Sequence, residues 1–191
     1  MIAGLEDVSS GEIWFGDRKV NDLEPKDRDI SMVFQSYGLY PNMSVYENIR
    51  FPLRVRGIPA AEHRERVLKA AKMVELMEFL DRRPAALSGG QRQRVALARA
   101  LAAGAPIVLL DEPFGALDAI TRGDLQEMFL ALRARTRLAA LLVTHDLHEA
   151  SLLADRIVVT RGGRIEQTST PAGLAAAPAT PYVAELLRRA R

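Results

Sequence analysis

Cysteine is absent from the 191-residue sequence, so the chain can form neither a disulfide framework nor a thiolate metal site. Long apolar runs are missing as well: no stretch approaches the roughly 18 consecutive apolar residues of a transmembrane helix. The first residues also lack the charged and apolar regions of a secretion signal. These absences predict a chain that neither spans a membrane nor carries a secretion signal, and they are compatible with a reducing compartment.

An excess of charge of one sign is also lacking. The 26 basic and 24 acidic residues give a net charge of only +2, and the positive charges are spread along the chain. We therefore expect no nucleic-acid partner, because such partners require a basic patch. The contents of hydrophobic residues (48%) and charged residues (26%) are ordinary, which predicts one folded domain and excludes a disordered or filamentous chain.

The pattern of apolar residues divides the chain into three parts. A strand-rich segment over residues 8–35 is followed by a helical region from Val45 to Leu101 and then by short, continuous apolar runs. Such runs are typical of buried parallel strands. The strands that we expect are Glu12–Phe15, Arg18–Val20, Ile30–Phe34, Ile107–Leu110, Leu138–Val143 and Ile157–Val159.

Helical spacing of apolar residues is clearest in two stripes, one of Val67, Ala70, Ala71, Val74 and Met77 and one of Leu125, Met128, Phe129 and Leu132. After Gly104, strands alternate with helices, which predicts an α/β fold with a doubly wound parallel sheet. The chain closes with an Ala- and Pro-rich stretch and a short helix. This helix bears Arg188, Arg189 and Arg191, so we expect it at the surface.

Two carboxylates follow the apolar run Ile107–Leu110. Asp111 and Glu112 would lie at the carboxyl end of a strand, the edge at which open α/β sheets bind ligands. One of them suits Mg²⁺, and the other suits a base that orients water for attack on a phosphoryl group. The alternative is a polar strand end without a ligand.

Ser88, Gly89, Gly90 and Gln91 precede a helical run, where backbone amides and the helix dipole favour an anion such as phosphate. The alternative is structural, since Ser88 and Gln91 also form an S-x-x-Q capping box. A pure cap does not need two glycines, which are poor helix formers.

Three further polar residues end strands or begin helices. His145 follows Leu141–Thr144, and Gln35 ends the run Ile30–Phe34. Asp118 is either an N-cap or a loop contact, while Asp146 and Glu149 fit the capping pair of the next helix. Taken singly, each of these residues has an adequate structural explanation.

Together, the segments resemble one family. The run Leu87–Arg94 resembles the signature motif of ABC-transporter ATPases, and the order of Gln35, signature, Asp111–Glu112, Gly115–Asp118 and Val143–Asp146 is similar to that family over essentially all 191 residues. The stretch Val33–Pro41 resembles importer ATPases for sugars and osmoprotectants, and residues 118–163 favour the osmoprotectant type.

This resemblance implies a nucleotide site that uses ATP and Mg²⁺. Asp111 is then the metal-linked Walker B aspartate, Glu112 the base that polarises water, and His145 the switch histidine. Gln35 is the Q-loop residue, which serves both catalysis and the metal, and Asp118 belongs to the D-loop. Ser88, Gly89, Gly90 and Gln91 would contact the γ-phosphate of an ATP held by the other subunit of a head-to-tail dimer.

The resemblance also implies a RecA-like P-loop NTPase core with a parallel sheet, a small antiparallel β segment and an inserted helical subdomain. Its parts would be the core (1–43 and 102–170), the helical subdomain (44–101) and a C-terminal helix (171–191). The partners implied are membrane permease subunits, a second copy or a paired ATPase subunit and, indirectly, a solute-binding protein. The location implied is the cytoplasmic face of the plasma membrane, and residues 37–56 would meet the permease.

One departure from the family is large. The family has a phosphate-binding loop, G-x-x-x-x-G-K-[ST], but none of the four lysines here, Lys19, Lys26, Lys69 and Lys72, follows a glycine. The aromatic residue that stacks on adenine in the family is missing as well. Met1–Glu6 resembles the end of the helix that follows the phosphate-binding loop, so we expect the sequence to begin just after that loop. We therefore expect these residues alone to be inactive, and the run Ile107–Leu110 to lack a neighbouring strand and form a sticky edge.

Two alternatives remain beside an importer ATPase. The chain could be a non-catalytic ABC subunit that lends Ser88–Gln91 to an intact partner. A DNA-repair or cohesin-like ATPase is disfavoured, because the 53 residues between Gln35 and Ser88 leave no room for a long coiled-coil arm.

Overall fold

A computed structural model describes residues 1–136 and 138–190 of the chain. The chain divides into two compact units, Met1–Leu141 and Leu142–Arg191, and each is described by itself. Within the described residues, no helix combines the length and the apolar character needed to cross a membrane.

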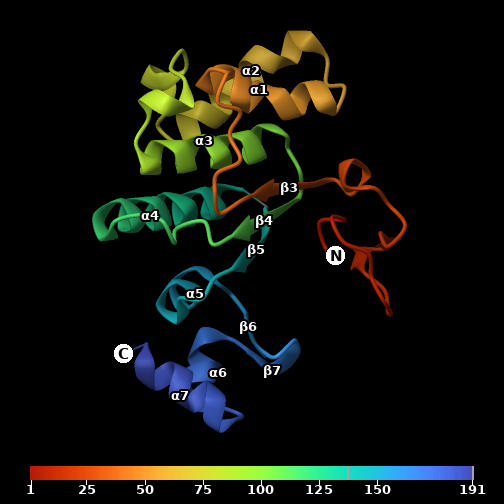
Figure 1. Cartoon of the computed structure of the whole chain (residues 1–191), viewed down its shortest axis with the longest axis vertical. Coiled ribbons are helices and arrows are strands. Elements are labelled where there is room, and N and C mark those ends of the chain that lie inside the picture. The colour runs from red at the N-terminus through yellow and green to blue at the C-terminus, as the bar shows by residue number, and fades with distance from the viewer. Residues whose placement is uncertain (137, 191) are drawn as a thin grey trace. The chain divides into compact units, whose positions relative to one another are not determined.

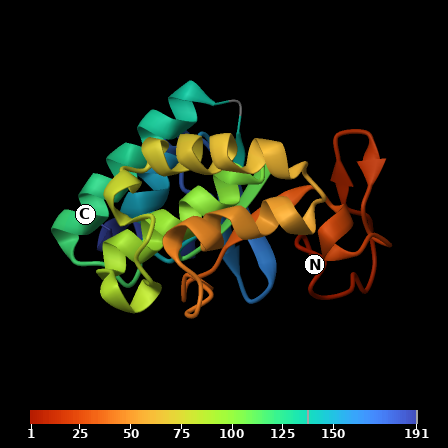
Figure 2. The same ribbon diagram turned by 90° about the horizontal axis from the view of Figure 1, so that it is seen from above.

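The first unit begins with a small hairpin. Strands β1 (Trp14–Phe15) and β2 (Arg18–Lys19) pair antiparallel, as the sequence predicted, and Figure 2 shows this hairpin projecting to one side. A 3-10 helix, η1 (Pro25–Asp27), then leads into β3 (Ile30–Val33). The buried side chain of Arg28 stabilises this region. Its guanidinium donates hydrogen bonds of 2.6–3.1 Å to the carbonyl oxygens of Met1, Ile2, Asn21 and Leu23.

We predict that Arg28→Lys loosens this N-terminal segment. Lysine keeps the charge but lacks the planar guanidinium that donates hydrogen bonds to four carbonyl groups. The free energy that protects the backbone amides from exchange should therefore fall by about 1–2 kcal/mol. Hydrogen exchange over residues 1–23 measures this loss. The exposed Arg18 is the matched control, and Arg18→Lys should exchange as the wild type does. Equal protection in both variants would contradict this role of Arg28.

The sheet of the first unit has the order β3-β4-β5. Strand β4 (Ile107–Asp111) pairs parallel with β3, with Val33 opposite Leu110. Val108, Leu109 and Leu110 are buried in β4, whereas β5 (Ala139–Val143) is largely exposed. The parallel sheet is therefore confirmed. The expectation that Ile107–Leu110 lacks a neighbour is wrong, because β4 lies between two strands, and β5 is not the buried strand that its apolar run predicted.

Three helices lie on one side of this sheet, with α3 (Gly89–Ala102) next to it and α1 (Val45–Val55) and α2 (Ala60–Met73) packed on α3 (Figure 1). Helix α3 contacts both other helices and β3. The predicted stripe is buried at Val67, Ala70, Ala71 and Val74, but Met77 is 46% exposed. Helix α2 ends before it, because Glu75 adopts a left-handed backbone (φ +57°), and Met77 begins a 3-10 helix, η2 (Met77–Phe79). A further 3-10 turn, η3 (Pro84–Ala86), leads into α3.

Helix α4 (Ala119–Arg135) completes the first unit. Its predicted apolar face is confirmed at Leu125, Phe129 and Leu132, which are all buried. The Phe129 ring packs edge-on against Phe114, with 6.4 Å between the ring centroids. This contact joins α4 to the loop that follows β4.

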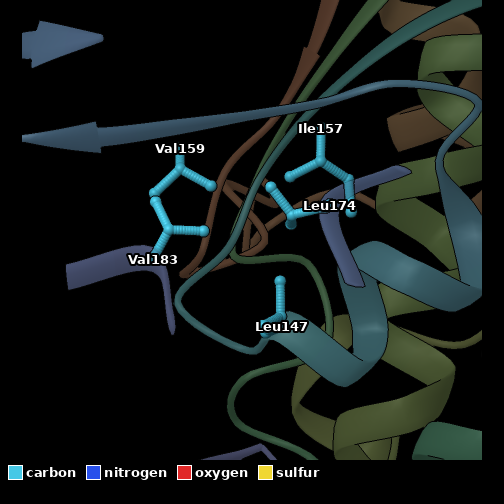
Figure 3. Packing of buried hydrophobic residues seen from close by; sticks show 5 residues of the cluster. All are labelled: Leu147, Ile157, Val159, Leu174 and Val183. Atoms are coloured by element: carbon cyan, nitrogen blue, oxygen red, sulfur yellow. The ribbon is translucent and has the colours of Figure 1, made fainter. Parts of the chain in front are cut away.

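The second unit has its own small core. Helix α5 (Leu147–Leu153), strands β6 (Ile157–Arg161) and β7 (Arg164–Ser169), and helices α6 (Pro171–Ala176) and α7 (Pro181–Arg189) surround Leu147, Ile157, Val159, Leu174 and Val183. In Figure 3, Val159 and Val183 point toward each other.

Two features of this unit differ from the sequence prediction. Strand β6 pairs antiparallel with β7, which was not predicted, and its residues alternate: Ile157 and Val159 are buried whereas Val158 is 50% exposed. The short C-terminal helix is in fact two helices. Arg188 and Arg189 of α7 lie at the surface and pair with Glu185, whereas Arg191 lies outside the described residues.

Candidate functional site

The register of β3 and β4 places Gln35 beside Glu112. Because Val33 lies opposite Leu110, continuing the same register by two residues brings Gln35 level with Glu112. The Gln35 Nε2 atom donates a hydrogen bond of 3.2 Å to Glu112 Oε2. The side-chain carbonyl oxygen of Gln35, Oε1, accepts no hydrogen bond from any residue that the structure describes. The sequence-predicted catalytic pair is therefore in contact at the carboxyl edge of the sheet.

Glu112 has an unusual backbone. Its φ of +43° lies in the left-handed region, which side chains other than glycine rarely adopt. Its carbonyl oxygen accepts the Gly115 amide at 3.2 Å, which closes a tight turn directly after β4. Strained residues of this kind occur preferentially at functional sites.

Asp111 is the last residue of β4 and is half-buried. In residues 1–136 and 138–190, no group of three or more His, Cys, Asp and Glu side chains is placed to hold a metal ion. Asp111, with the side-chain carbonyl oxygen of Gln35, therefore fits Mg²⁺ only if phosphate oxygens and water complete the shell. This is the usual way in which proteins bind Mg²⁺ beside a nucleotide.

The capping box at the start of α3 is confirmed. Ser88 Oγ accepts the Gln91 amide at 3.2 Å, and Gln91 Oε1 accepts the Ser88 amide at 2.9 Å. The amides of Gly89 and Gly90 donate to no other described residue, so two donors of the helix N-terminus stay available to an anion. The cap and the anion site are thus compatible, whereas the sequence presented them as alternatives.

The two glycines differ in what surrounds them. A Cβ atom at Gly90 would lie 2.4 Å from Thr121 Cγ2, so Gly90 permits the close approach of α3 and α4. A Cβ atom at Gly89 would meet only ordinary contacts, at 3.5 Å from the Tyr37 hydroxyl and 3.7 Å from Leu117 Cδ2. Packing therefore explains Gly90 but not Gly89.

Asp118 caps helix α4. Its Oδ1 accepts the Thr121 amide at 3.0 Å, and this hydrogen bond lowers the pKa of the Asp118 carboxyl group below its ordinary value. The N-cap alternative is confirmed. The side chain is exposed, so a ligand role stays a prediction.

His145 belongs to the second unit, two residues after the end of β5. Its switch role stays a prediction. Asp146, which follows it, caps α5 by accepting the amides of His148 and Glu149, as expected, and Glu149 is buried.

A groove of about 790 Å³ lies beside the Q-loop segment, between β3, α1 and α3. Its apolar lining includes Phe34, Tyr40, Phe51 and Val55, and the Tyr40 and Phe51 rings pack at a tilt of 46° with their centroids 4.5 Å apart. A second hollow, of about 530 Å³, lies near α2 and Thr136, and its lining includes none of the candidate site residues described above.

Sequence reasoning missed Thr121 and Arg99 near this site. Arg99 lies in α3 and donates to the carbonyl oxygens of Tyr37 and Gly38, which follow Gln35 closely. One signal for Arg99 was present: it stands among Leu97, Ala98 and Ala100, where a charged residue interrupts an apolar run. Nothing in the sequence pointed to Thr121.

The sequence pattern that defines the family described as "ABC transporter" matches residues 1–115, more than half of the chain. The chain belongs to the ABC transporter family. This confirms the resemblance on which the interpretation of the signature, Q-loop and Walker B residues was based.

Curated relatives of this ABC protein are import subunits by name. The "sn-glycerol-3-phosphate import ATP-binding protein UgpC" of Ralstonia nicotianae is 50% identical over 184 residues, which are 96% of this chain and 50% of the relative. The "Oligosaccharides import ATP-binding protein MsmX" of Bacillus subtilis is 50% identical over 171 residues, 90% of this chain and 47% of the relative. The chain thus spans about half the length of the curated relatives that it matches.

Solved structures agree with the fold. "Dimeric Structure of MJ0796, a Bacterial ABC Transporter Cassette" matches with a TM-score of 0.76 at 35% identity and covers 88% of this chain and 77% of that one. The ATP-binding cassette MJ0796 bound to ADP and Pi, described as the dimeric structure of a post-hydrolysis state, matches with a TM-score of 0.75 at 34% identity over the same shares. The predicted ABC ATPase fold is therefore confirmed.

Proposed function

We propose that this ABC protein is the part of an importer's ATP-binding subunit that carries the catalytic carboxylate, the signature motif and the permease-docking surface. The observation that carries the proposal is the 3.2 Å contact between Gln35 and Glu112 directly beside Asp111. The names of the relatives favour a sugar-type solute, either a glycerol phosphate or an oligosaccharide.

In the proposed reaction, Glu112 accepts a proton from the water that attacks the γ-phosphate of ATP. The Gln35 amide orients the Glu112 carboxylate through the hydrogen bond between them. Asp111 and the Gln35 carbonyl oxygen would hold Mg²⁺, which when bound neutralises phosphate charge. His145 would serve as the switch histidine, as the family resemblance implies.

The signature motif would act on a second nucleotide site. The unpartnered amides of Gly89 and Gly90, with Ser88, can bind the γ-phosphate of an ATP held by another subunit. Both MJ0796 structures are described as dimeric, which supports a head-to-tail arrangement for this chain. Asp118, at the exposed start of α4, would lie in the same interface.

The groove of about 790 Å³ would receive a short cytoplasmic helix of a permease. Its aromatic and aliphatic lining suits the apolar face of such a helix. Arg99 adds a positive charge to the lining, whereas the charge of Arg56 is paired with Asp29 at 2.7 Å. Docking there would place the protein on the cytoplasmic face of the membrane, with a solute-binding protein on the other side of the permease.

The phosphate-binding loop would come from outside these 191 residues, because they contain no G-x-x-x-x-G-K-[ST] sequence. We expect the 191-residue chain to show no Mg²⁺-dependent ATP hydrolysis above background. The fused chain, in which such a loop segment from an ABC ATPase directly precedes Met1, should hydrolyse ATP. Release of inorganic phosphate measures both, and turnover by the 191-residue chain at the rate of the fused chain would contradict the proposal.

The non-catalytic alternative makes a different prediction. A subunit that only lends its signature would restore hydrolysis when mixed with an intact ABC ATPase whose own signature serine has been replaced. Restoration by the wild-type chain but not by a Ser88→Arg chain, together with an inactive fused chain, would favour this alternative.

A further inference from the structure

The segment that joins Gln35 to α1 is held from two sides. Tyr37 and Gly38 both have left-handed backbones, with φ of +66° and +57°. A Cβ atom at Gly38 would lie 3.2 Å from the Phe34 ring and 3.3 Å from Arg99 Nη2, so the turn requires glycine there. The carbonyl oxygens of Tyr37 and Gly38 accept hydrogen bonds from Arg99 Nη2 at 3.0 Å and Nη1 at 2.5 Å.

The other half of the segment is held by Asn48, a fully buried residue of α1. Its Nδ2 atom donates to the carbonyl oxygens of Tyr40, Met43 and Ser44, and its Oδ1 accepts the Tyr40 amide at 2.8 Å. These hydrogen bonds therefore fix residues 40–44 to the start of α1. Arg99 is the polar contact that ties the turn at residues 37–38 to α3.

Among the described residues, the positive charge of Arg99 is balanced by the dipoles of two carbonyl groups and by the face of an aromatic ring. It forms no ion pair with an acidic side chain of the described residues, and its guanidinium lies 5.9 Å from the centre of the Tyr40 ring. Burial lowers the pKa of Arg99 below its ordinary value. A partly desolvated guanidinium binds carbonyl groups more strongly than an exposed one does, because water competes less.

Tyr37 extends the same contact toward the signature motif. The Arg92 guanidinium lies 5.8 Å from the centre of the Tyr37 ring, and the hydroxyl of Tyr37 lies near Gly89. Tyr37 thus contacts α3 in two ways: its side chain lies near Gly89 and Arg92, and its carbonyl oxygen accepts a hydrogen bond from Arg99.

We propose that Arg99 is a positioning residue for Gln35: by fixing the Tyr37–Gly38 turn to α3, it keeps the Gln35 side chain within reach of Glu112. The signature helix and the Q-loop then move as one body. The importance of this for catalysis rests on the proposed function, but the contact itself can be tested without nucleotide.

The first measurement is amide hydrogen exchange in the 191-residue chain. Arg99→Gln should raise the exchange rate of residues 36–39 about tenfold and leave residues 45–55 unchanged, and Arg99→Lys should fall between. Arg94 is the matched control, because it lies in the same helix and pairs with Glu75. Arg94→Gln should leave residues 36–39 at the wild-type rate. Unchanged exchange at residues 36–39 in Arg99→Gln, or a rise of equal size throughout the chain, overturns the proposal.

The second measurement reports whether Arg99 acts through Gln35. The side-chain amide resonance of Gln35, assigned by its loss in Gln35→Ala, should shift when Glu112→Ala removes its acceptor. That shift should fall at least twofold in the Arg99→Gln background and persist in the Arg94→Gln background. An equal shift in the Arg99→Gln and wild-type backgrounds overturns the proposal. Failure of the fused chain to hydrolyse ATP would affect neither measurement.

Discussion

Glu112→Gln should lower ATP hydrolysis by the fused chain by a factor on the order of 10² to 10⁴ and leave ATP binding intact. Glutamine keeps the size of the side chain and its contact with Gln35, but it cannot accept the proton of the attacking water. The unhydrolysed nucleotide should then hold two subunits together, because each ATP would contact Ser88–Gly90 of the opposite subunit.

Asp111→Asn is the matched comparison, since it changes the neighbouring carboxylate in the same way. Asp111 is expected to contact the metal, so its loss should weaken binding of Mg-ATP itself and give no stable dimer. Size-exclusion chromatography at saturating ATP measures the difference. A monomeric Glu112→Gln chain beside a dimeric Asp111→Asn chain would show that the two roles have been exchanged.

Gly90→Ala should lower the free energy of unfolding of the 191-residue chain by about 2–3 kcal/mol. The added methyl group would lie 2.4 Å from Thr121 Cγ2, so α3 and the first turn of α4 would have to separate. Gly89→Ala, one residue away, should remain within about 0.5 kcal/mol of the wild type, because its methyl group meets only ordinary contacts. Urea titration followed by circular dichroism gives these values.

Thr121→Ser provides a direct check of this explanation. Serine lacks the Cγ2 atom, so the double variant Gly90→Ala with Thr121→Ser should regain most of the lost stability, although each change alone is unfavourable or neutral. Losses that simply add in the double variant would mean that Gly90 is required for a reason other than its contact with Thr121.

Local patterns carried much of the fold and part of the site. The apolar run Ile107–Leu110 and the polar residues after it sufficed to place Asp111 and Glu112 at a strand end, because strand interiors and strand ends differ in composition. The S-x-x-Q pattern at Ser88–Gln91 likewise predicted a capping box, which depends on residues only three positions apart.

Features that depend on distant residues escaped prediction. An apolar run does not show which strand lies in the middle of a sheet, so the exposure of β5 could not be inferred from the run Leu138–Val143. In the same way, the run Ile157–Val159 did not reveal that β7 pairs with it. Arg99 is 61 residues from Gly38, and Gly90 is 31 residues from Thr121, so neither pair leaves a periodic signal in the sequence.

The left-handed backbone at Glu112 has a consequence for any effort to stabilise this protein. Such a conformation costs a residue with a side chain on the order of 1 kcal/mol, and glycine relieves it. Glycine would also remove the carboxylate that Gln35 contacts at 3.2 Å. Thermal robustness and the geometry of the predicted base therefore oppose each other at this one position, and a screen for stability alone would select against the chemistry.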